Sequence, residues 1–355
     1  MKILENCDLR SLNTFGISAS AKFFVEMHNE TDLKELFGLS EFKRNNKVFL
    51  GGGSNILFTK SFDGIVVLNK LRGMEILEEN SETAIVRAMS GEIWHDLVVF
   101  SLEHKYWGIE NLSLIPGTVG AAPMQNIGAY GAELRNVLEN VEAYEVATGV
   151  KRVFSKEECE LGYRDSVFKN KLKNKYFISA ITLKLNKMEK KNISYKALKE
   201  YLEKNKIEIN NPKNISDAVV FIRQSKLPDP KIIGNAGSFF KNVFVPVRSA
   251  PHSEEGGEKR KLEELLEKYP DMPYFEENKT IKIPAGWLIE QCGPANGTSW
   301  KGYRVGNVGV HEKQALVLVN YGGATGEELV ELANKIVTSV KKKFGLELVP
   351  EVNIV

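Results

Sequence analysis

Two glycine-rich segments have the composition of ligand-binding loops. The first, Gly51, Gly52, Gly53, Ser54 and Asn55, follows a predicted strand over residues 47–50. Residues without a side chain allow consecutive backbone N–H groups to approach an anion, and Ser54 and Asn55 add polar groups. This pattern suits a diphosphate, although an ordinary glycine turn has the same composition.

The second segment, residues 115–131, combines Gly117, Gly120, Gly128 and Gly131 with small neighbours and is too rich in glycine for a regular element. Such a backbone can lie flat against a large ligand. Neither segment has the GxGxxG spacing of a Rossmann site, and the chain has no GxxxxGK[ST] P-loop. Two separate loops therefore predict a dinucleotide that is held between them.

Two further segments carry cations that could bind a carboxylate or a phosphate. Tyr163 stands beside Arg164, whose guanidinium is permanently charged, and Arg223 and Lys226 lie at the end of a helix predicted over residues 216–223. Each pattern, taken alone, is also typical of a surface salt-bridge cluster.

Ser238 and Glu351 are the remaining candidates for chemistry. Small residues surround Ser238 in segment 234–242, which resembles neither a helix nor an alternating strand, and Phe239 and Phe240 would anchor it. A glycine turn that enters a strand is the alternative. Glu351 interrupts a terminal strand predicted over residues 348–355, where an exposed glutamate is the usual case. The chain has no GxSxG, no HExxH and no paired Cys/His clusters, so hydrolase and metal sites lack support.

The hydrophobic pattern predicts mixed helices and strands that position these residues. The chain opens in β-α-β order, with strands at 22–27 and 47–50 around a helix at 30–39 that begins at Thr31 or Asp32. Further strands are expected at 64–68, 84–89, 139–146 and 177–185, and further helices at 93–104, 195–204, 216–223 and 326–344. A domain boundary is expected near Pro212.

The composition is that of a soluble globular protein. Of 355 residues, 43% are hydrophobic and 26% are charged, and the net charge of +2 gives no nucleic-acid footprint. Apolar runs are too short for a membrane span, and Glu5 and Asp8 interrupt any signal peptide. Cys7, Cys159 and Cys292 form no disulfide framework. We therefore expect a cytoplasmic monomer that binds neither membranes nor nucleic acids.

Seven segments in chain order carry a resemblance to a known family. They are GGGSN after a strand, IPGTVGAAPMQNIGAYG, YRDS, RxxKLPDP, GNAGSFFKN, AGWLIEQ and a terminal PEV. Together they resemble the UDP-N-acetylenolpyruvoylglucosamine reductases nearly end to end. The resemblance implies an α+β, three-domain FAD-binding fold of the vanillyl-alcohol-oxidase (PCMH) type with a C-terminal substrate-binding domain. The implied domains are 1–68 with the C-terminal strand 346–355, then 69–215, then 216–345.

The resemblance also implies the reaction. An enzyme of this family reduces the enolpyruvyl ether of UDP-N-acetylenolpyruvoylglucosamine to UDP-N-acetylmuramate on the way to peptidoglycan. NADPH reduces the bound FAD and leaves, and the sugar nucleotide then occupies much the same space. Arg164 is implied to stabilise the enolate-like charge, Ser238 to donate the proton, and Glu351 to complete the catalytic set.

Binding residues follow by the same matching. The residues expected to hold FAD are Gly51, Gly52, Gly53, Ser54, Asn55, Ile115, Pro116, Gly117, Gly120, Met124, Gln125, Asn126, Gly128 and Arg223. The residues expected to contact the substrate are Tyr163, Tyr195, Lys226, Asn242 and Gln314, with Lys226 on the diphosphate. Tyr195 resembles the lid tyrosine of the longer family type, and an exposed helix residue is the alternative.

Two departures and two rival functions remain. Val243 stands where the family pattern has proline, and segment 251–260, within a charged insert that extends to residue 268, is longer than usual. The first rival function is an FAD-dependent oxidase of a small alcohol in the same superfamily. The second is a flavin- or nucleotide-binding protein without turnover, against which the set of Arg164, Ser238 and Glu351 argues.

Overall fold

The computed structural model describes residues 1–246, 263–277 and 280–355. Contacts divide the chain into two units: the first comprises residues 1–12, 19–54 and 61–225, and the second comprises residues 13–18, 55–60 and 226–355. The expected domain limits at 68 and 215 stay predictions. The long segment 251–260 lies outside the described residues, and so does the start of the charged insert.

The first sheet of the first unit has the strand order β1-β2-β5-β3. Strand β5 (Phe62–Asn69) pairs in parallel with both β2 (Ser20–Met27) and β3 (Asn46–Leu50), and β1 (Leu4–Asp8) pairs antiparallel with β2. Helices α1 (Glu30–Gly38) and α2 (Ser40–Arg44) bury apolar side chains against this sheet. The predicted β-α-β order is thus confirmed.

Helix α1 begins at Glu30, as the predicted range does, but its N-cap lies two or three residues before the residues expected to begin it. Asn29 is the N-cap, because its side chain accepts a hydrogen bond from the N–H of Asp32, while the Asp32 carboxylate accepts from Asn29. The expectation that Thr31 or Asp32 begins the helix is therefore wrong. Asp32 instead occupies the third helical position of a capping box.

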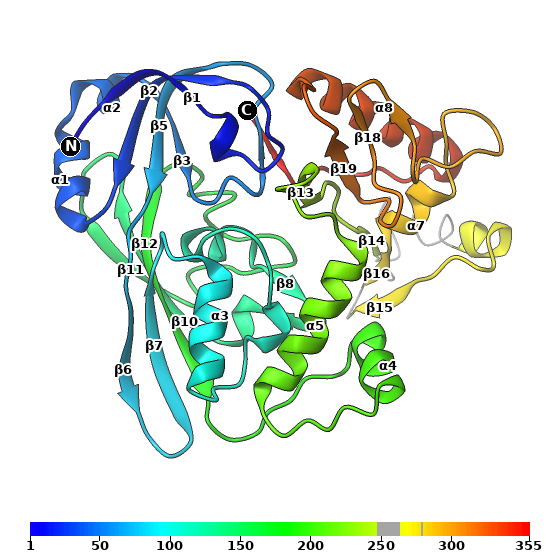
Figure 1. Ribbon diagram of the computed structural model, residues 1–355, viewed down its shortest axis with the longest axis horizontal. Coiled ribbons are helices and arrows are strands. Elements are labelled where there is room, and N and C mark those ends of the chain that lie inside the picture. The colour runs from blue at the N-terminus through cyan, green and yellow to red at the C-terminus, as the bar shows by residue number, and fades with distance from the viewer. Residues whose placement is uncertain (247–262, 278–279) are drawn as a thin grey trace, which may run out of the picture. The chain divides into compact units, whose positions relative to one another are not determined.

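The second sheet of the first unit is antiparallel, in the order β11-β10-β12-β7-β6. Its strands are β6 (Met74–Glu79), β7 (Thr83–Met89), β10 (Leu138–Glu145), β11 (Lys151–Ser155) and β12 (Tyr176–Asn186). Helix α3 (Trp94–Glu103) shares one apolar cluster with β7 and β12 (Figure 1). Segment 115–131 is irregular, as predicted, with short 3-10 turns and the two-residue strand β8 (Gly128–Ala129) paired to β9 (Ala132–Glu133).

Two helices close the first unit. Helix α4 (Lys196–Lys204) and helix α5 (Pro212–Lys226) share an apolar cluster with Trp107. Helix α5 thus extends beyond the predicted range 216–223 at both ends. At its start, Pro212 fits the first helical position, where no N–H is needed. The boundary expected near Pro212 stays a prediction, since contacts keep this helix in the first unit up to Ser225.

The second unit contains two small antiparallel sheets around helix α8 (Gly326–Phe344). One has the order β13-β19-β18-β17 and the other the order β14-β16-β15. Their strands are β13 (Gly234–Ser238), β14 (Val243–Pro246), β15 (Phe275–Glu277), β16 (Thr280–Ile283), β17 (Arg304–Val305), β18 (Val308–Val310) and β19 (Val317–Asn320). Helix α8 and the short helix α7 (Ala285–Glu290) belong to the core of this unit.

Two expectations for the second unit are wrong. Segment 234–238 is a strand, β13, because it pairs with the fully buried β19 despite its small residues. The terminal strand predicted over 348–355 is regular only at β20 (Asn353–Ile354), which pairs in parallel with β4 (Ile56–Leu57). Pro350 lies in the irregular part, where it makes only an isolated bridge to Phe240.

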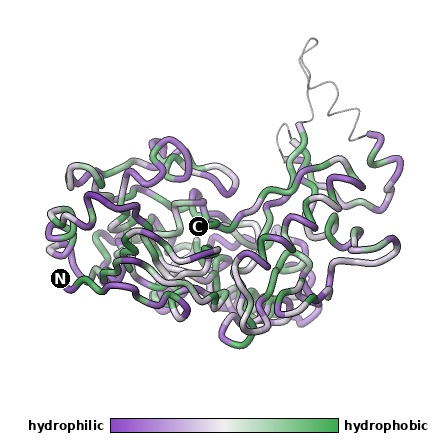
Figure 2. Tube along the Cα trace, turned by 90° about the horizontal axis from the view of Figure 1, so that it is seen from above, coloured by the Kyte–Doolittle hydropathy of each residue, from purple (hydrophilic) through white to green (hydrophobic). Residues whose placement is uncertain are grey.

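The described residues contain no helix that is both long enough and apolar enough to span a membrane. In Figure 2 the hydropathy of the chain changes over short stretches.

Candidate functional site

The two glycine-rich loops contact each other within the first unit. A Cβ atom built on Gly51 would lie 2.2 Å from Oγ1 of Thr118, and one built on Gly52 would lie 3.0 Å from the Cα of Gly117. Gly117 has a φ of +112°, and its Cβ would lie 2.8 Å from Oγ of Ser54. The absence of side chains thus lets the backbones of Gly52 and Gly117 approach each other and leaves room for the side chains of Thr118 and Ser54, so the two loops form one surface.

Arg164 lies on a tight turn beside the second loop. Gly162 and Asp165 bridge the turn, and Arg164 itself has a φ of +51°, which is uncommon for a residue with a side chain. Its Nη2 donates to the carbonyl of Gly128 at 2.6 Å, and its guanidinium lies 5.3 Å from the ring centre of Tyr163. The structure therefore brings together Arg164, Tyr163 and the expected cofactor loop.

Arg223 has a buried side-chain nitrogen without a partner. Its Nε is inaccessible to solvent and finds no hydrogen-bond acceptor among the described residues. Burial lowers the pKa of this guanidinium; Tyr130 opposes the shift and Arg164 adds to it. The pKa of His95 is lowered by its own burial, opposed by Asp96 and reinforced by Arg223. Arg223 and Arg164 thus lie close enough for their charges to interact, and within this positive region the Nε of Arg223 lacks an acceptor among the described residues.

Tyr195 packs on the end of the second glycine loop. Its ring meets the ring of Tyr130 edge-on at 5.2 Å between centroids, and its side chain is 48% exposed. Tyr195 also precedes helix α4 directly as its N-cap residue. An exposed position next to the loop is compatible with both expectations for this residue, so its lid role stays a prediction.

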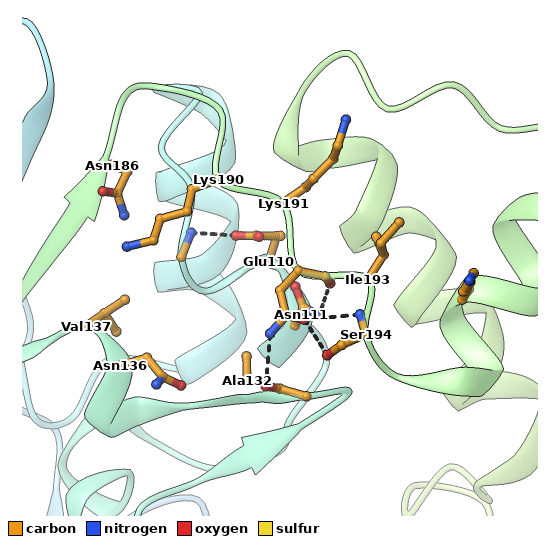
Figure 3. Close-up of a pocket in the computed structure, with 14 residues that line it drawn as sticks. Glu110, Asn111, Ala132, Asn136, Val137, Asn186, Lys190, Lys191, Ile193 and Ser194 are labelled. Carbon is orange, nitrogen blue, oxygen red and sulfur yellow. Dashed lines mark hydrogen bonds between the residues drawn. The ribbon is translucent and has the colours of Figure 1, made fainter.

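A pocket of about 730 Å³ in the first unit is lined by residues 190–194, just before Tyr195, and by Gly131 of the second glycine loop (Figure 3). The residues that line the pocket include Glu110 and Asn111, which are 2% and 1% exposed. The amide of Asn111 donates to the carbonyls of Tyr130 and Asn192, both at 2.8 Å, and so ties the segment before Tyr195 to the glycine loop. Burial raises the pKa of Glu110. None of the residues expected to bind FAD or substrate lines this pocket.

Within the second unit, Glu351 lies beside Phe239, the residue that follows Ser238. The N–H of Glu351 donates to the carbonyl of Phe239 at 2.8 Å, and the N–H of Lys241 donates to Val349 at 2.9 Å. The C-terminal segment therefore runs beside the residues that follow Ser238. Asn55, at the end of the first glycine loop, donates to the carbonyl of Glu351 at 3.4 Å.

Asn242 and Gln314 both lie at the start of helix α7. Oδ1 of Asn242 accepts from the N–H of Ala285 at 3.1 Å. A Cβ built on Gly286 would lie 3.3 Å from Oε1 of Gln314, so the side chain of Gln314 lies close to the first turn of this helix. Lys226, the last residue of helix α5, is exposed. These three residues belong to the second unit, whereas Tyr163 and Tyr195 belong to the first.

The remaining cofactor candidates occupy the second loop. Gly120 donates its N–H to Ser90 at 2.8 Å, and the carbonyl of Met124 accepts from Ser166 at 2.7 Å. Asn126 is fully buried. Ile115, Pro116 and Gln125 are at least partly accessible.

The residues present suit FAD. Flavin dinucleotides offer carbonyl and phosphate oxygens, which are the acceptors that the orphaned Nε of Arg223 lacks. The loops that contain Gly51 and Gly117 present glycine backbone rather than bulky side chains where they meet.

Sequence reasoning missed several residues that shape the site. Thr118 contacts Gly51, Tyr130 carries the ring on which Tyr195 packs, and Asn111 joins both segments. Tyr130 stands between two glycines of the loop, and its φ of +49° marks a position where an aromatic residue is uncommon. No sequence pattern indicates that Asn111 joins the two segments, because its partners are distant in sequence.

Two family models match the chain. A model described as the FAD binding domain matches residues 21–153, and one described as UDP-N-acetylenolpyruvoylglucosamine reductase, C-terminal domain, matches residues 229–355. The UDP-N-acetylenolpyruvoylglucosamine reductase of Amoebophilus asiaticus is 47% identical over 356 residues, and that of Flavobacterium johnsoniae is 43% identical over 357 residues. All of this chain and all of each relative are covered.

The fold has a counterpart among solved structures. A crystal structure of the enzyme MurB from Thermus caldophilus superposes with a TM-score of 0.65 at 20% identity, over 99% of this chain and 98% of that chain. At this identity the likeness concerns the fold alone. The predicted α+β fold with an FAD-binding domain is confirmed.

Proposed function

The chain belongs to the UDP-N-acetylenolpyruvoylglucosamine reductase family, and from this premise we propose how its residues perform the reaction. It is an FAD-dependent oxidoreductase of peptidoglycan precursor synthesis that reduces UDP-N-acetylenolpyruvoylglucosamine with NADPH. The reaction adds a hydride and a proton across the carbon–carbon double bond of the enolpyruvyl ether. When bound, FAD supplies the hydride after it has taken one from NADPH.

FAD is held by the surface that the two glycine loops form. The loops around Gly51 and Gly117 accommodate the dinucleotide, and Arg223 donates to one of its acceptor oxygens. The support for this assignment is the buried, unpartnered Nε of Arg223 beside the second loop. Ser54 and Asn55 add polar contacts at the end of the first loop.

Arg164 stabilises the negative charge that develops during the reduction. Addition of a hydride to the vinyl carbon leaves carbanion character on the neighbouring carbon, which is delocalised into the substrate carboxylate. A fixed guanidinium at that carboxylate stabilises the transition state more than the ground state. The hydrogen bond from Nη2 to Gly128 at 2.6 Å holds the guanidinium in place before substrate arrives.

Ser238 supplies the proton and Glu351 assists. A serine hydroxyl is a weak acid, but the carbanion that it quenches is a strong base, so the transfer runs downhill. The observation that carries this part of the proposal is the pairing of the C-terminal segment beside Ser238, with Glu351 bonded to Phe239 at 2.8 Å.

Five residues are proposed to contact the substrate. Lys226 contacts the diphosphate, Asn242 and Gln314 bind the sugar nucleotide near helix α7, and Tyr163 and Tyr195 are the other two contacts. A cytoplasmic location and a monomeric state are part of this proposal. The location is supported by Cys7, Cys159 and Cys292, none of which lies in a disulfide.

A Ser238→Ala variant tests the proton donor. It should bind FAD and be reduced by NADPH as the wild type is, while product formation slows by roughly 10²- to 10⁴-fold. Ser299→Ala is the matched control, because this exposed serine lies in the same unit and donates to Glu290 outside the proposed site. Normal turnover of Ser238→Ala would refute the proton-donor role.

A further inference from the structure

Two buried polar side chains brace the turn that carries Arg164. The turn runs from Gly162 to Asp165, which exchange backbone hydrogen bonds of 3.0 and 3.4 Å. Arg164 adopts a left-handed conformation, φ +51°, between them. A side-chain-bearing residue keeps such a conformation only where its surroundings impose it. The braces on the turn are therefore expected to determine where the guanidinium lies.

Asn126 is the first brace. Its amide nitrogen donates to the carbonyl of Gly162 at 2.8 Å and to the carboxylate of Glu133 at 3.0 Å, and its oxygen accepts from the N–H of Arg135 at 3.0 Å. Both amide hydrogens are thus engaged within the protein, and the residue is fully buried. Its position in the second glycine loop, at φ +43°, is one that asparagine tolerates well.

Ser166 is the second brace, on the other side of the turn. Its hydroxyl donates to the carbonyl of Met124 at 2.7 Å, and the residue is 1% exposed. Asn126 and Ser166 therefore tie both ends of the Arg164 turn to the same short stretch of the glycine loop. The guanidinium itself is bonded to Gly128, two residues beyond Asn126.

We propose that Asn126 and Ser166 are positioning residues that hold Arg164 in register with the second glycine loop. The inference rests on the proposed function of Arg164 as the cation that faces the substrate carboxylate. It assigns Asn126 a task other than direct contact with FAD, because neither of its amide hydrogens is available to a ligand. It gives Ser166, whose hydroxyl donates to the carbonyl of Met124, a task in the same reaction.

The test compares Ser166→Ala with Ser101→Ala. Ser101 is a matched control, because it is also fully buried and its hydroxyl also donates to a backbone carbonyl, that of Leu97 at 2.9 Å in helix α3. In Ser166→Ala the reduction of flavin by NADPH should keep its rate within about twofold, while reoxidation by UDP-N-acetylenolpyruvoylglucosamine should slow roughly tenfold. Ser101→Ala should change neither step, and Ser166→Thr, which keeps the hydroxyl, should restore most of the second rate.

Binding provides a readout that does not depend on turnover. UDP-N-acetylmuramate carries a lactyl carboxylate that UDP-N-acetylglucosamine lacks. By titration calorimetry, Ser166→Ala and Asn126→Ser should bind UDP-N-acetylmuramate several-fold more weakly than the wild type does. Their affinity for UDP-N-acetylglucosamine should be unchanged. Equal loss for both nucleotides, or loss for neither, would overturn the positioning role. Should Asn126→Ser fail to fold, the Ser166→Ala result alone decides.

The wild-type protein serves as the reference that separates the positioning role from the role of Arg164. If the wild-type protein binds UDP-N-acetylmuramate no better than UDP-N-acetylglucosamine, the role of Arg164 falls and the inference falls with it. If the wild type discriminates and Ser166→Ala discriminates equally well, only the positioning role is refuted.

Discussion

The contact between the two glycine loops can be tested with one added methyl group. In Gly51→Ala the new Cβ would lie 2.2 Å from Oγ1 of Thr118, which is 8% exposed and has little room to move. Overpacking of this kind costs about 1–3 kcal/mol. If the loops bind FAD in this arrangement, the cost should appear as a roughly tenfold or larger increase in the FAD dissociation constant, together with a lower urea midpoint.

A second substitution separates this clash from other causes. The three atoms nearest to a Cβ on Gly51 all belong to Thr118, and in Thr118→Ala only the Cβ at 3.4 Å remains, an ordinary contact distance. Gly51→Ala combined with Thr118→Ala should therefore bind FAD within about 0.5 kcal/mol of Thr118→Ala alone. Gly38→Ala is the neutral control, since nothing lies within 4 Å of its Cβ. Wild-type FAD affinity in Gly51→Ala, measured by flavin fluorescence, would refute the loop contact.

Three further predictions concern single contacts. Arg87 holds the pKa of Glu142 at about 2, below the ordinary 4.5, so this carboxylate stabilises the fold above pH 4.5 and loses that effect towards pH 2. In urea titrations, Arg87→Met should therefore lower the free energy of unfolding by about 1–2 kcal/mol at pH 7 and by less at pH 3. An equal loss at both pH values would contradict the pairing. Thr325→Ala removes the N-cap of helix α8 and should lower the free energy of unfolding by about 1 kcal/mol with the flavin spectrum unchanged. Asn111→Ala should speed limited proteolysis near Asn192 several-fold, because both hydrogen bonds that tie this segment to the loop are lost; an unchanged cleavage rate would argue against the tie.

Local patterns predicted the regular elements well. Helix α8 has the bounds that its periodicity indicated, since Thr325 with Glu328 and then Gly345 provide clear start and stop signals. Helix α1 was misplaced at its start because three neighbouring residues could each cap it. Only the geometry shows that the side chain of Asn29 reaches Asp32.

Features that depend on distant partners could not be predicted. Strand β13 consists of small residues with little strand preference, and it forms because β19 offers a buried partner. Gly51 was predicted from its motif as a cofactor contact, whereas its packing against Thr118 in the other loop could not be predicted. The motif predicted Asn126 as a contact of FAD. Only its hydrogen bonds to Gly162 and Glu133 indicate that it holds the Arg164 turn in place.

The central claim is that reduced flavin in this protein passes its electrons to UDP-N-acetylenolpyruvoylglucosamine. The most direct measurement is anaerobic: the absorption band of the oxidised flavin is first bleached with one equivalent of NADPH, and the sugar nucleotide is then added. Our account predicts that the band returns in proportion to the nucleotide added and that UDP-N-acetylmuramate forms in equal amount. A flavin that bleaches with NADPH but stays bleached when the nucleotide is added would contradict it.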